Sequence, residues 1–382
     1  MSERKRYINR QVKERVSNIL ISTLILVLIA VSGEVFYYKH VQKQNEEKQA
    51  EEERIRQEEE LKAIKEKEDS DSFYQKLSDG FDVDILIIGD SIGDGAGASD
   101  ENHRWANMLC RSIEETYNVS ADMNNISMGG NTSYAGYART MLLNDNVACD
   151  LAIVCYGEND STADFDLYYE AIIRAVQNRY PKASIISILE SSQKGYTQKI
   201  KTIESVADHY GIQTADTIEP FLKNYDELVV DPIHPNDEGM AVYCETVMNV
   251  IKTSADQYRG NDPEDVSPIN EKVRAFDKLQ WFSEDMFTRE GNTFTLNTTA
   301  KGTIMGIYWN LSNGNNSCQI MIDGKEYVNS DIYFKHDFIQ PHINIVNDWT
   351  ENDEINIQEE IRIIFDDDFR ADGFTGLLIS GS

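Results

Sequence analysis

Two short segments of the chain carry side chains that together could attack an ester. Gly89-Asp90-Ser91-Ile92 directly follows the apolar run 83–88 and puts a hydroxyl at the carboxyl end of a buried strand, where open α/β sheets keep their chemistry. Asp231-Pro232-Ile233-His234 carries a carboxylate and an imidazole just before a helical pattern. A serine hydroxyl needs a base within hydrogen-bond reach, and that base needs a third group to fix its tautomer. These residue types therefore suit Ser91 as nucleophile, His234 as base and Asp231 as the group that orients His234.

Two further segments supply donors for the negative charge that develops on the carbonyl oxygen. The stretch 125–133 contains Gly129 and Gly130 ahead of a helical pattern, so its backbone N–H groups can point at an anion. The apolar run 151–156 ends in Gly157-Glu158-Asn159-Asp160, which places an amide at another strand's carboxyl end. Each preorganised donor contributes on the order of a hundred- to a thousandfold in rate. The candidates are the N–H groups of Ser91 and Gly130 and the side chain of Asn159.

In this order the four segments resemble the SGNH/GDSL hydrolase superfamily, which is named for its Ser, Gly, Asn and His. The resemblance covers residues 82 to 254. It implies Ser91, Asp231 and His234 as the catalytic residues and Ser91, Gly130 and Asn159 as the oxyanion hole. Trp105 also falls where many members carry a Trp that packs near the first segment. Ile92 stands where the eponymous motif has Leu, but this departure removes no reacting atom.

Strands and helices are expected to alternate along the part of the chain that carries these segments. Such alternation predicts a parallel sheet with helices on both faces, a three-layer α/β/α flavodoxin-like domain over 73–256. All four segments then fall on one rim of the sheet. The expected strands are 83–89, 122–127, 150–157, 183–189 and 212–215, and the expected helices are 104–117, 133–144, 164–179, 195–210 and 236–252.

The amino-terminal part of the chain has the pattern of a membrane anchor. A basic tail over 1–15 precedes an uncharged run and the aromatic group Phe36-Tyr37-Tyr38, so 16–38 has the length and flanks of a transmembrane signal anchor. The remainder of the chain would then be extracytoplasmic. A cleaved signal peptide is the alternative, because Ala30-Val31-Ser32 resembles a small-residue cleavage site. Residues 39–72 are rich in Glu, Lys and Gln and predict a charged helical stalk, with a dimeric coiled coil as the alternative.

The composition changes again after the last expected helix. A polar linker over 257–270 leads into 271–382, where short apolar runs are separated by turn signals such as Asn313-Gly314 and Asp323-Gly324. This pattern predicts an all-β sandwich. The sandwich could cover the first domain, contribute to a dimer or bind carbohydrate. The side chains proposed for stacking on sugars, if exposed, are Trp281, Trp309 and Trp349.

Composition excludes several kinds of partner. The net charge of −30 makes nucleic acid an improbable partner, since phosphate binding needs clustered cations. No Cys/His cluster has zinc-ligand spacing, and we expect no metal and no cofactor. A structural or substrate-contact role is expected for His103. A surface or packing role is expected for His40, His209, His336 and His342.

These observations predict an extracytoplasmic serine esterase that removes acyl groups, most simply acetyl groups, from an acylated glycan through an acyl-enzyme. An O-acetyltransferase is the alternative, passing the acyl group to a cell-wall or capsular polysaccharide and fed by a multi-spanning membrane acyltransferase. The motifs do not separate water from a sugar hydroxyl as the acceptor. A lipase is disfavoured because the stalk would lift the site from the membrane. A non-catalytic, membrane-tethered glycan-binding protein is the alternative of a different class.

Overall fold

The computed structural model describes residues 3–257, 266–335, 337–347 and 354–381. The chain divides into two compact units at the boundary between Ser70 and Asp71. Most of the predicted linker, together with His336 and Trp349, lies outside the described residues. The two units are described separately below.

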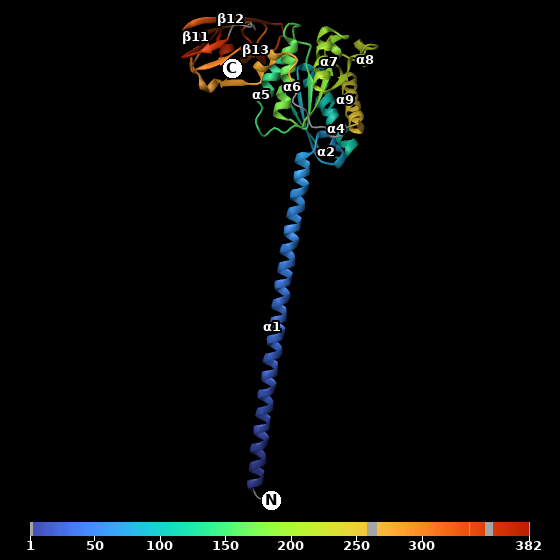
Figure 1. Cartoon of the computed structure of the whole chain (residues 1–382), viewed down its shortest axis with the longest axis vertical. Coiled ribbons are helices and arrows are strands. Elements are labelled where there is room, and N and C mark those ends of the chain that lie inside the picture. The colour runs from blue at the N-terminus through green and yellow to red at the C-terminus, as the bar shows by residue number, and fades with distance from the viewer. Residues whose placement is uncertain (1–2, 258–265, 336, 348–353, 382) are drawn as a thin grey trace. The chain divides into compact units, whose positions relative to one another are not determined.

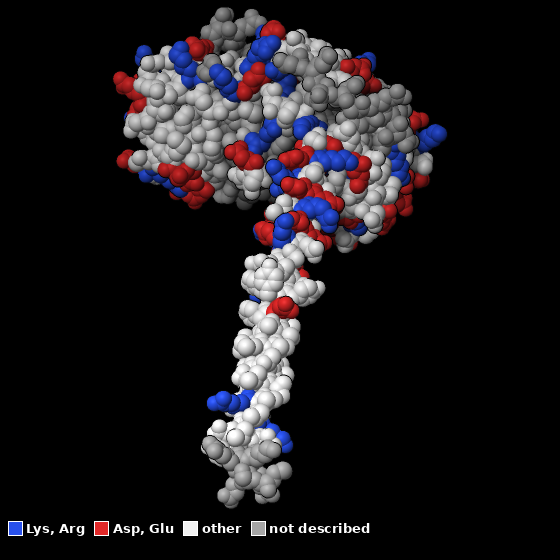
Figure 2. Space-filling model, turned by 60° about the horizontal axis from the view of Figure 1, so that its bottom comes forward, with Lys and Arg blue, Asp and Glu red and all other residues white. Residues whose placement is uncertain are grey.

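The first unit is one continuous helix, α1 (Glu3–Ser70), drawn in blue in Figure 1. It contains an apolar stretch that is long enough to cross a membrane, and none of that stretch is buried against protein. Figure 2 shows this part of the helix as a surface nearly free of charged side chains. The following turns carry ion pairs four residues apart, such as Lys43 with Glu47 and Lys62 with Glu66. Such pairs stabilise a solvated helix by a few tenths of a kcal/mol each, roughly. The expected helical stalk is therefore present.

The second unit begins with a five-stranded parallel sheet in the order β2-β1-β3-β4-β5. This order is the flavodoxin-like one. In the register of the sheet, Gly89 at the end of β1 lies beside Cys155 at the end of β3, so the segments that follow these two strands start side by side. The strands are β1 (Val83–Gly89), β2 (Ala121–Asn125), β3 (Leu151–Cys155), β4 (Ser184–Leu189) and β5 (Gln213–Asp216).

Helices cover both faces of this sheet, because both faces of its strands are apolar. Leu86 and Ile88 of β1 belong to one buried cluster, whereas Ile85 and Ile87 belong to another, as expected for side chains that alternate along a strand. The first face is covered by α5 (Ser133–Met141), α6 (Phe165–Arg179) and α7 (Gln198–Tyr210). The second face is covered by α2 (Phe73–Asp79), α4 (Trp105–Tyr117) and α9 (Asp237–Gln257). The predicted three-layer α/β/α architecture is confirmed (Figure 1).

Three helix boundaries differ from the expected ones by three residues or more, and the first is the end of α5, at Met141 instead of 144. Helix α7 begins three residues later than expected, because Thr197 caps it by accepting a hydrogen bond from the Ile200 N–H. Helix α9 continues to Gln257, beyond the expected end at 252. Short helical segments fill the connections: α3 (Ser91–Asp94), α8 (Ile218–Phe221), α10 (Asp368–Asp372), η1 (Glu101–His103), η2 (Ser191–Gln193), η3 (Tyr225–Glu227), η4 (Glu271–Phe276) and η5 (Glu284–Met286).

The predicted β-sandwich is also present, and we call it the β domain. Its two antiparallel sheets have the orders β13-β10-β16-β6 and β12-β11-β15-β8-β7, and a two-stranded sheet pairs β14 with β9. A buried cluster including Met305, Ile320 and Ile363 fills the space between the main sheets. The strands are β6 (Leu279–Ser283), β7 (Thr288–Glu290), β8 (Thr293–Asn297), β9 (Ala300–Gly302), β10 (Ile304–Leu311), β11 (Gly314–Ile322), β12 (Lys325–Phe334), β13 (Gln340–Ile345), β14 (Ile355–Ile357), β15 (Glu360–Phe365) and β16 (Gly376–Ser380).

The expectation that Trp309 is exposed for sugar stacking is wrong. Trp309 is fully buried in the sandwich core, and its indole N–H donates to Asn344 at 3.1 Å. Its position in β10 turns it inward together with Met305 and Ile307. Trp281 is half-buried and packs over Gly376, where an added Cβ would lie 2.2 Å from its ring.

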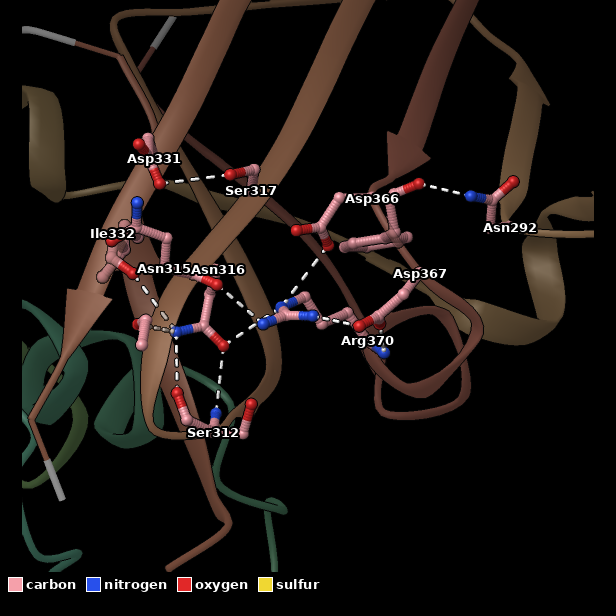
Figure 3. A network of polar contacts seen from close by, with 12 residues as sticks. Asn292, Ser312, Asn315, Asn316, Ser317, Asp331, Ile332, Asp366, Asp367 and Arg370 are labelled. Atoms are coloured by element: carbon pink, nitrogen blue, oxygen red, sulfur yellow. Dashed lines mark hydrogen bonds and ion pairs between the residues drawn. The ribbon is translucent and has the colours of Figure 1, made fainter. Parts of the chain in front are cut away.

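One buried polar network holds a corner of the β domain together (Figure 3). The Asn316 amide donates to the carbonyls of Ser312 and Ile332 at 2.9 and 3.2 Å, while its oxygen accepts from Arg370 Nε at 3.1 Å. Arg370 also pairs with Asp366, at 3.4 Å, and with Asp367. Both the donors and the acceptor of the Asn316 side chain are satisfied, which is the usual condition for a buried structural amide.

The β domain packs directly on α5 and α6. Tyr134 of α5 and Ile343 of β13 belong to the same buried cluster, together with Phe276 of η4. At the edge of this contact the guanidinium of Arg174 forms a bidentate ion pair with Asp277 at 2.8 Å. The two domains therefore share one apolar core, and the β domain lies beside the helices that follow the second and third motif segments (Figure 1).

Candidate active site

Ser91 lies at the turn between β1 and α3. Asp90 caps this short helix, since its carboxylate accepts the Ile92 N–H at 2.9 Å. The turn is tight: a Cβ added to Gly89 would lie 2.8 Å from the Cys155 carbonyl oxygen. The indole N–H of Trp105 donates to the Ile92 carbonyl at 2.8 Å, which confirms that this Trp packs near the first segment. The Ser91 hydroxyl is thus held at the carboxyl end of β1.

The structure brings Ser91, His234 and Asp231 into one line of contacts. The distance from Ser91 Oγ to His234 Nε2 is 2.9 Å, and that from His234 Nδ1 to Asp231 Oδ2 is 2.7 Å. The loop that carries His234 packs closely against Gly97: a Cβ added there would lie 2.2 Å from the Pro235 carbonyl oxygen. Gly97 also has a φ of +103°, which favours glycine. With Nδ1 protonated toward Asp231, Nε2 is free to accept the Ser91 proton.

Asp231 is arranged to remain charged. Its Oδ1 accepts the backbone N–H groups of Ile233 and His234 at 2.8 and 2.9 Å. Burial by itself would raise the pKa of Asp231, but these hydrogen bonds and the one from the His234 ring outweigh it and lower the pKa below its ordinary value. The carboxylate is therefore suited to stabilise a protonated imidazole.

The other two predicted oxyanion donors, Gly130 and Asn159, belong to segments that lie beside the Ser91 turn. Gly129 faces Ser91, since a Cβ added to it would lie 3.4 Å from Ser91 Cβ, and Gly130 has a left-handed backbone with φ +70°. The Asn159 amide donates to Asp90 Oδ2 and to the Asn131 carbonyl, each at 3.2 Å. Both of its hydrogens thus have protein acceptors, and an oxyanion would compete for one of these two long hydrogen bonds. Catalytic hydrogen bonds often tighten only when substrate binds.

Buried acids lie behind the site. Burial raises the pKa of Asp90 to about 8, and the charges of Asp160 and Glu158 add to the rise. Burial also raises the pKa of Asp160 to about 6, although its hydrogen bonds with Ser133 oppose the increase. Glu190, fully buried, has its pKa raised well above the ordinary value for the same reason. Such shifted groups are typical of functional sites.

The loop that carries Asn159 is braced at both ends. The Lys199 ammonium donates to the carbonyls of Gly157 and Asp160, the latter at 3.1 Å. The Asp160 carboxylate accepts the N–H and the hydroxyl of Ser133, at 2.9 and 2.5 Å, at the start of α5. The Asn159 amide therefore projects from a fixed loop.

The β domain adds residues that the sequence did not indicate. A Cβ on Gly129 would lie 3.3 Å from Gln340 Nε2, and one on Gly130 would lie 3.1 Å from His342 Cε1. His342 is buried and packs against Phe334, with ring centroids 5.0 Å apart, so a packing role fits it. Both residues lie on β13, and no motif marks them. Their approach to the site follows only from the packing of the two domains.

The remaining described histidines lie outside this line of contacts. His103 Nδ1 is 3.0 Å from Asp100 Oδ1 and 3.3 Å from the hydroxyl of Ser99. His209 Nε2 is 2.7 Å from the Ser267 carbonyl oxygen. Over the described residues, no group of three or more His, Cys, Asp or Glu side chains is placed to hold a metal ion.

Comparisons with known proteins agree with this geometry. Residues 87–242 match the model of the GDSL-like Lipase/Acylhydrolase family. A two-domain esterase (CEX) active on acetylated mannans superposes with a TM-score of 0.66 at 16% identity, covering 81% of this chain and 94% of its own. Its form co-crystallized with mannopentaose gives 0.64 at 17% identity, covering 81% and 93%. No curated protein matched the chain. At this identity the likeness shows a shared two-domain fold. The family match over residues 87–242 identifies that part of the chain as a GDSL-like lipase/acylhydrolase domain, the domain of a serine ester hydrolase.

Proposed function

We propose that this protein removes acetyl groups from an O-acetylated carbohydrate through an acyl-enzyme on Ser91. The observation that carries the proposal is the line of contacts from Asp231 through His234 to Ser91, at 2.7 and 2.9 Å. These are hydrogen-bond distances for a base that takes the nucleophile's proton and for the group that orients this base. Asp231 holds the imidazole and stabilises its charged form.

In the first half of the reaction Ser91 Oγ attacks the acetyl carbonyl carbon while His234 Nε2 takes the hydroxyl proton. The carbonyl oxygen becomes an oxyanion that accepts hydrogen bonds from the N–H groups of Ser91 and Gly130 and from the Asn159 amide. The tetrahedral intermediate collapses, the bond from carbon to the sugar oxygen breaks, and His234 gives its proton to that oxygen. The deacetylated sugar leaves, and Ser91 carries the acetyl group.

In the second half His234 takes a proton from water, and the resulting hydroxide attacks the acetyl carbon. The bond to Ser91 Oγ breaks and the proton returns to this oxygen. Acetic acid leaves and gives its remaining proton to the solvent as acetate forms. A sugar hydroxyl in place of water would make the same protein a transferase. Whether the protein hydrolyses or transfers the acetyl group therefore depends on whether water or a sugar hydroxyl reaches the acyl-enzyme.

The substrate class rests on the fold and on the surface beside the site. The two-domain esterase with the same fold is active on acetylated mannans. In this chain Phe338 is exposed just before β13, and its ring lies 5.6 Å from that of Phe334, which approaches the Gly130 loop. An exposed aromatic ring this close to the Gly130 loop suits a sugar chain, because sugar faces stack on such rings.

The test uses residues 71–382, which form a compact unit. We expect this unit to hydrolyse p-nitrophenyl acetate and to release acetate from at least one of acetylated mannan and acetylated xylan, and Ser91→Ala to do neither. Oligosaccharide acceptors are added in parallel, and acetylated acceptor is measured by mass spectrometry. Turnover of the small ester without acetate release from any acetylated glycan would overturn the substrate class. Transfer that exceeds hydrolysis would establish the O-acetyltransferase.

We also propose that residues 16–38 anchor the protein in a membrane with the catalytic unit outside the cytoplasm. Support comes from the exposed apolar stretch of α1 and from the basic residues ahead of it. The full-length protein should sediment with membranes, resist carbonate extraction and be digested by protease added to cells without an outer barrier. A soluble mature form beginning near Gly33 would establish signal-peptide cleavage instead. Complete protection of the catalytic unit in sealed cells would overturn the topology.

A further inference from the structure

We propose that Asn131 is a positioning residue that ties both oxyanion donors to the edge strand of the β domain. The proposal rests on the proposed function, because it concerns the oxyanion hole of that reaction. Asn131 directly follows the two glycines of the second motif segment, and its side chain is buried. Asn131 forms four hydrogen bonds of interest, two with residues of its own domain and two with β13.

The first link is to the Gly130 N–H. The Asn131 side-chain amide donates to the Gly129 carbonyl oxygen at 3.2 Å. The Gly129 carbonyl and the Gly130 N–H belong to one peptide unit, which is planar and trans, so they point in opposite directions from the same rigid plane. Fixing the carbonyl therefore fixes the direction of the N–H. Gly130 has φ +70°, and glycine has no Cβ to restrain this backbone, so the side chain of Asn131 supplies the restraint.

The second link is to the other donor. The backbone carbonyl of Asn131 accepts a hydrogen from the Asn159 amide at 3.2 Å, and Asp90 accepts the other hydrogen at the same distance. The position of the Asn131 backbone thus sets one of the two directions in which the Asn159 amide can point. One residue orients both predicted donors.

The third link joins Asn131 to the β domain. Strand β13 is at the edge of its sheet, and its inner side pairs with β10. Asn131 Nδ2 donates to the Pro341 carbonyl at 3.3 Å, and Asn131 Oδ1 accepts the Ile343 N–H at 3.2 Å. In a strand, the carbonyl of one residue and the N–H of the residue two positions later point to the same side, so the Pro341 carbonyl and the Ile343 N–H both lie on the unpaired side of β13. The Asn131 amide therefore pairs with β13 as a neighbouring strand would, and satisfies groups that an edge strand otherwise leaves unpaired.

Together these links make the β domain part of the catalytic apparatus. Because β13 is held by its sheet, it fixes the Asn131 amide, which in turn fixes the Gly130 peptide unit and one acceptor of Asn159. Oxyanion donors act mainly in the transition state, and small misplacements of such groups are costly in rate. Loss of the Asn131 amide should therefore lower kcat and leave KM nearly unchanged.

The test uses the full-length chain in detergent with p-nitrophenyl acetate as substrate. We expect Asn131→Ala to lower kcat by roughly ten- to a hundredfold with KM within about twofold, as for a displaced oxyanion donor. Asn131→Asp keeps the acceptor for the Ile343 N–H but loses the donors to Gly129 and Pro341, so it should lose kcat in the same way. This second variant keeps the side chain's size if the alanine variant does not fold.

Asn316→Ala is the matched control. Asn316 is equally buried and also bonds backbone groups, but its side chain bonds only residues of the β domain (Figure 3). It should lower the unfolding midpoint and keep kcat within about twofold of wild type. Wild-type kcat in both Asn131 variants, or a change in KM alone, would overturn the proposal while leaving the proposed function intact. A wild-type protein that neither hydrolyses the ester nor reacts with a fluorophosphonate at Ser91 would overturn both.

Discussion

Two buried polar regions of this protein differ in whether their polar atoms have hydrogen-bond partners. In the β domain, Arg370 is matched by Asp366 and Asp367, and the Asn316 amide has partners for its donors and its acceptor. Behind Ser91, Glu190 is fully buried with the weak Cys155 thiol donating to one oxygen, and its other oxygen has no partner among the described residues. A satisfied network stabilises a fold, whereas a costly one persists where chemistry needs it. We therefore expect substitutions in the β-domain network to change stability and substitutions around Ser91 to change the rate.

The largest effect on kcat/KM should come from substitutions in the region around Ser91. Ser91→Ala and His234→Ala should each reduce kcat/KM by on the order of 10⁴-fold or more, because members of a triad act as one unit. Their unfolding midpoints should stay near that of wild type, since Ser91 and His234 are half-buried. His209→Ala, which removes an imidazole bonded to the Ser267 carbonyl outside the triad, is the control and should retain activity. Hydrolysis at the wild-type rate in either triad variant would remove that residue from the mechanism.

Removal of Asn159, the proposed oxyanion donor, should give the next largest effect. We expect Asn159→Ala to lower kcat by roughly a hundred- to a thousandfold with little change in KM, because the amide acts on charge that exists only in the transition state. Steady-state kinetics on p-nitrophenyl acetate provides the measurement. A change confined to KM would reassign Asn159 to substrate binding.

The β-domain network should respond in stability instead of rate. Arg370→Ala leaves the Asn316 oxygen and two carboxylates without their guanidinium partner, so the free energy of unfolding should fall by about 1–3 kcal/mol. Urea unfolding measures this loss. At a temperature where the variant is folded, kcat should lie within about twofold of wild type. A large fall in kcat in the folded variant would show that this network also serves the site.

A further expected effect is a pH dependence of stability from Asp90. Its folded pKa is raised to about 8 from an ordinary value of 3.8, so between these values the folded state binds a proton that the unfolded state has lost. Stability from this group therefore falls as pH rises through the window from about 4 to about 8. The difference in unfolding free energy between wild type and Asp90→Asn, from urea titrations, should shrink over that window and level off above it. A constant difference would mean that Asp90 titrates normally.

The site residues that could be predicted from the sequence are those whose positions follow from the order of strands and helices along the chain. Ser91, Gly130 and Asn159 follow strands of a parallel sheet, so alternating elements were enough to place them on one rim. Asn131 stands beside the two glycines, and a buried polar residue there could have been suspected.

The partners of these residues could not be predicted in the same way. Pro341 and Ile343 belong to a strand of another domain, and they meet Asn131 through the way the two domains pack. Trp309 failed as a sugar platform for a related reason: which face of β10 turns inward depends on the opposite sheet. Local patterns predict elements, but they do not predict contacts between domains.

The central claim is that Ser91 forms the acyl-enzyme, and trapping that intermediate tests it most directly. The full-length protein is mixed with p-nitrophenyl acetate, quenched in acid on the millisecond timescale and digested for peptide mass mapping. We predict an acetyl group on Ser91 in the wild-type protein, formed together with a burst of p-nitrophenol, and none at this position in Ser91→Ala. Turnover of the ester with Ser91 unmodified, or with the acetyl group on another residue that is required for turnover, would contradict the account.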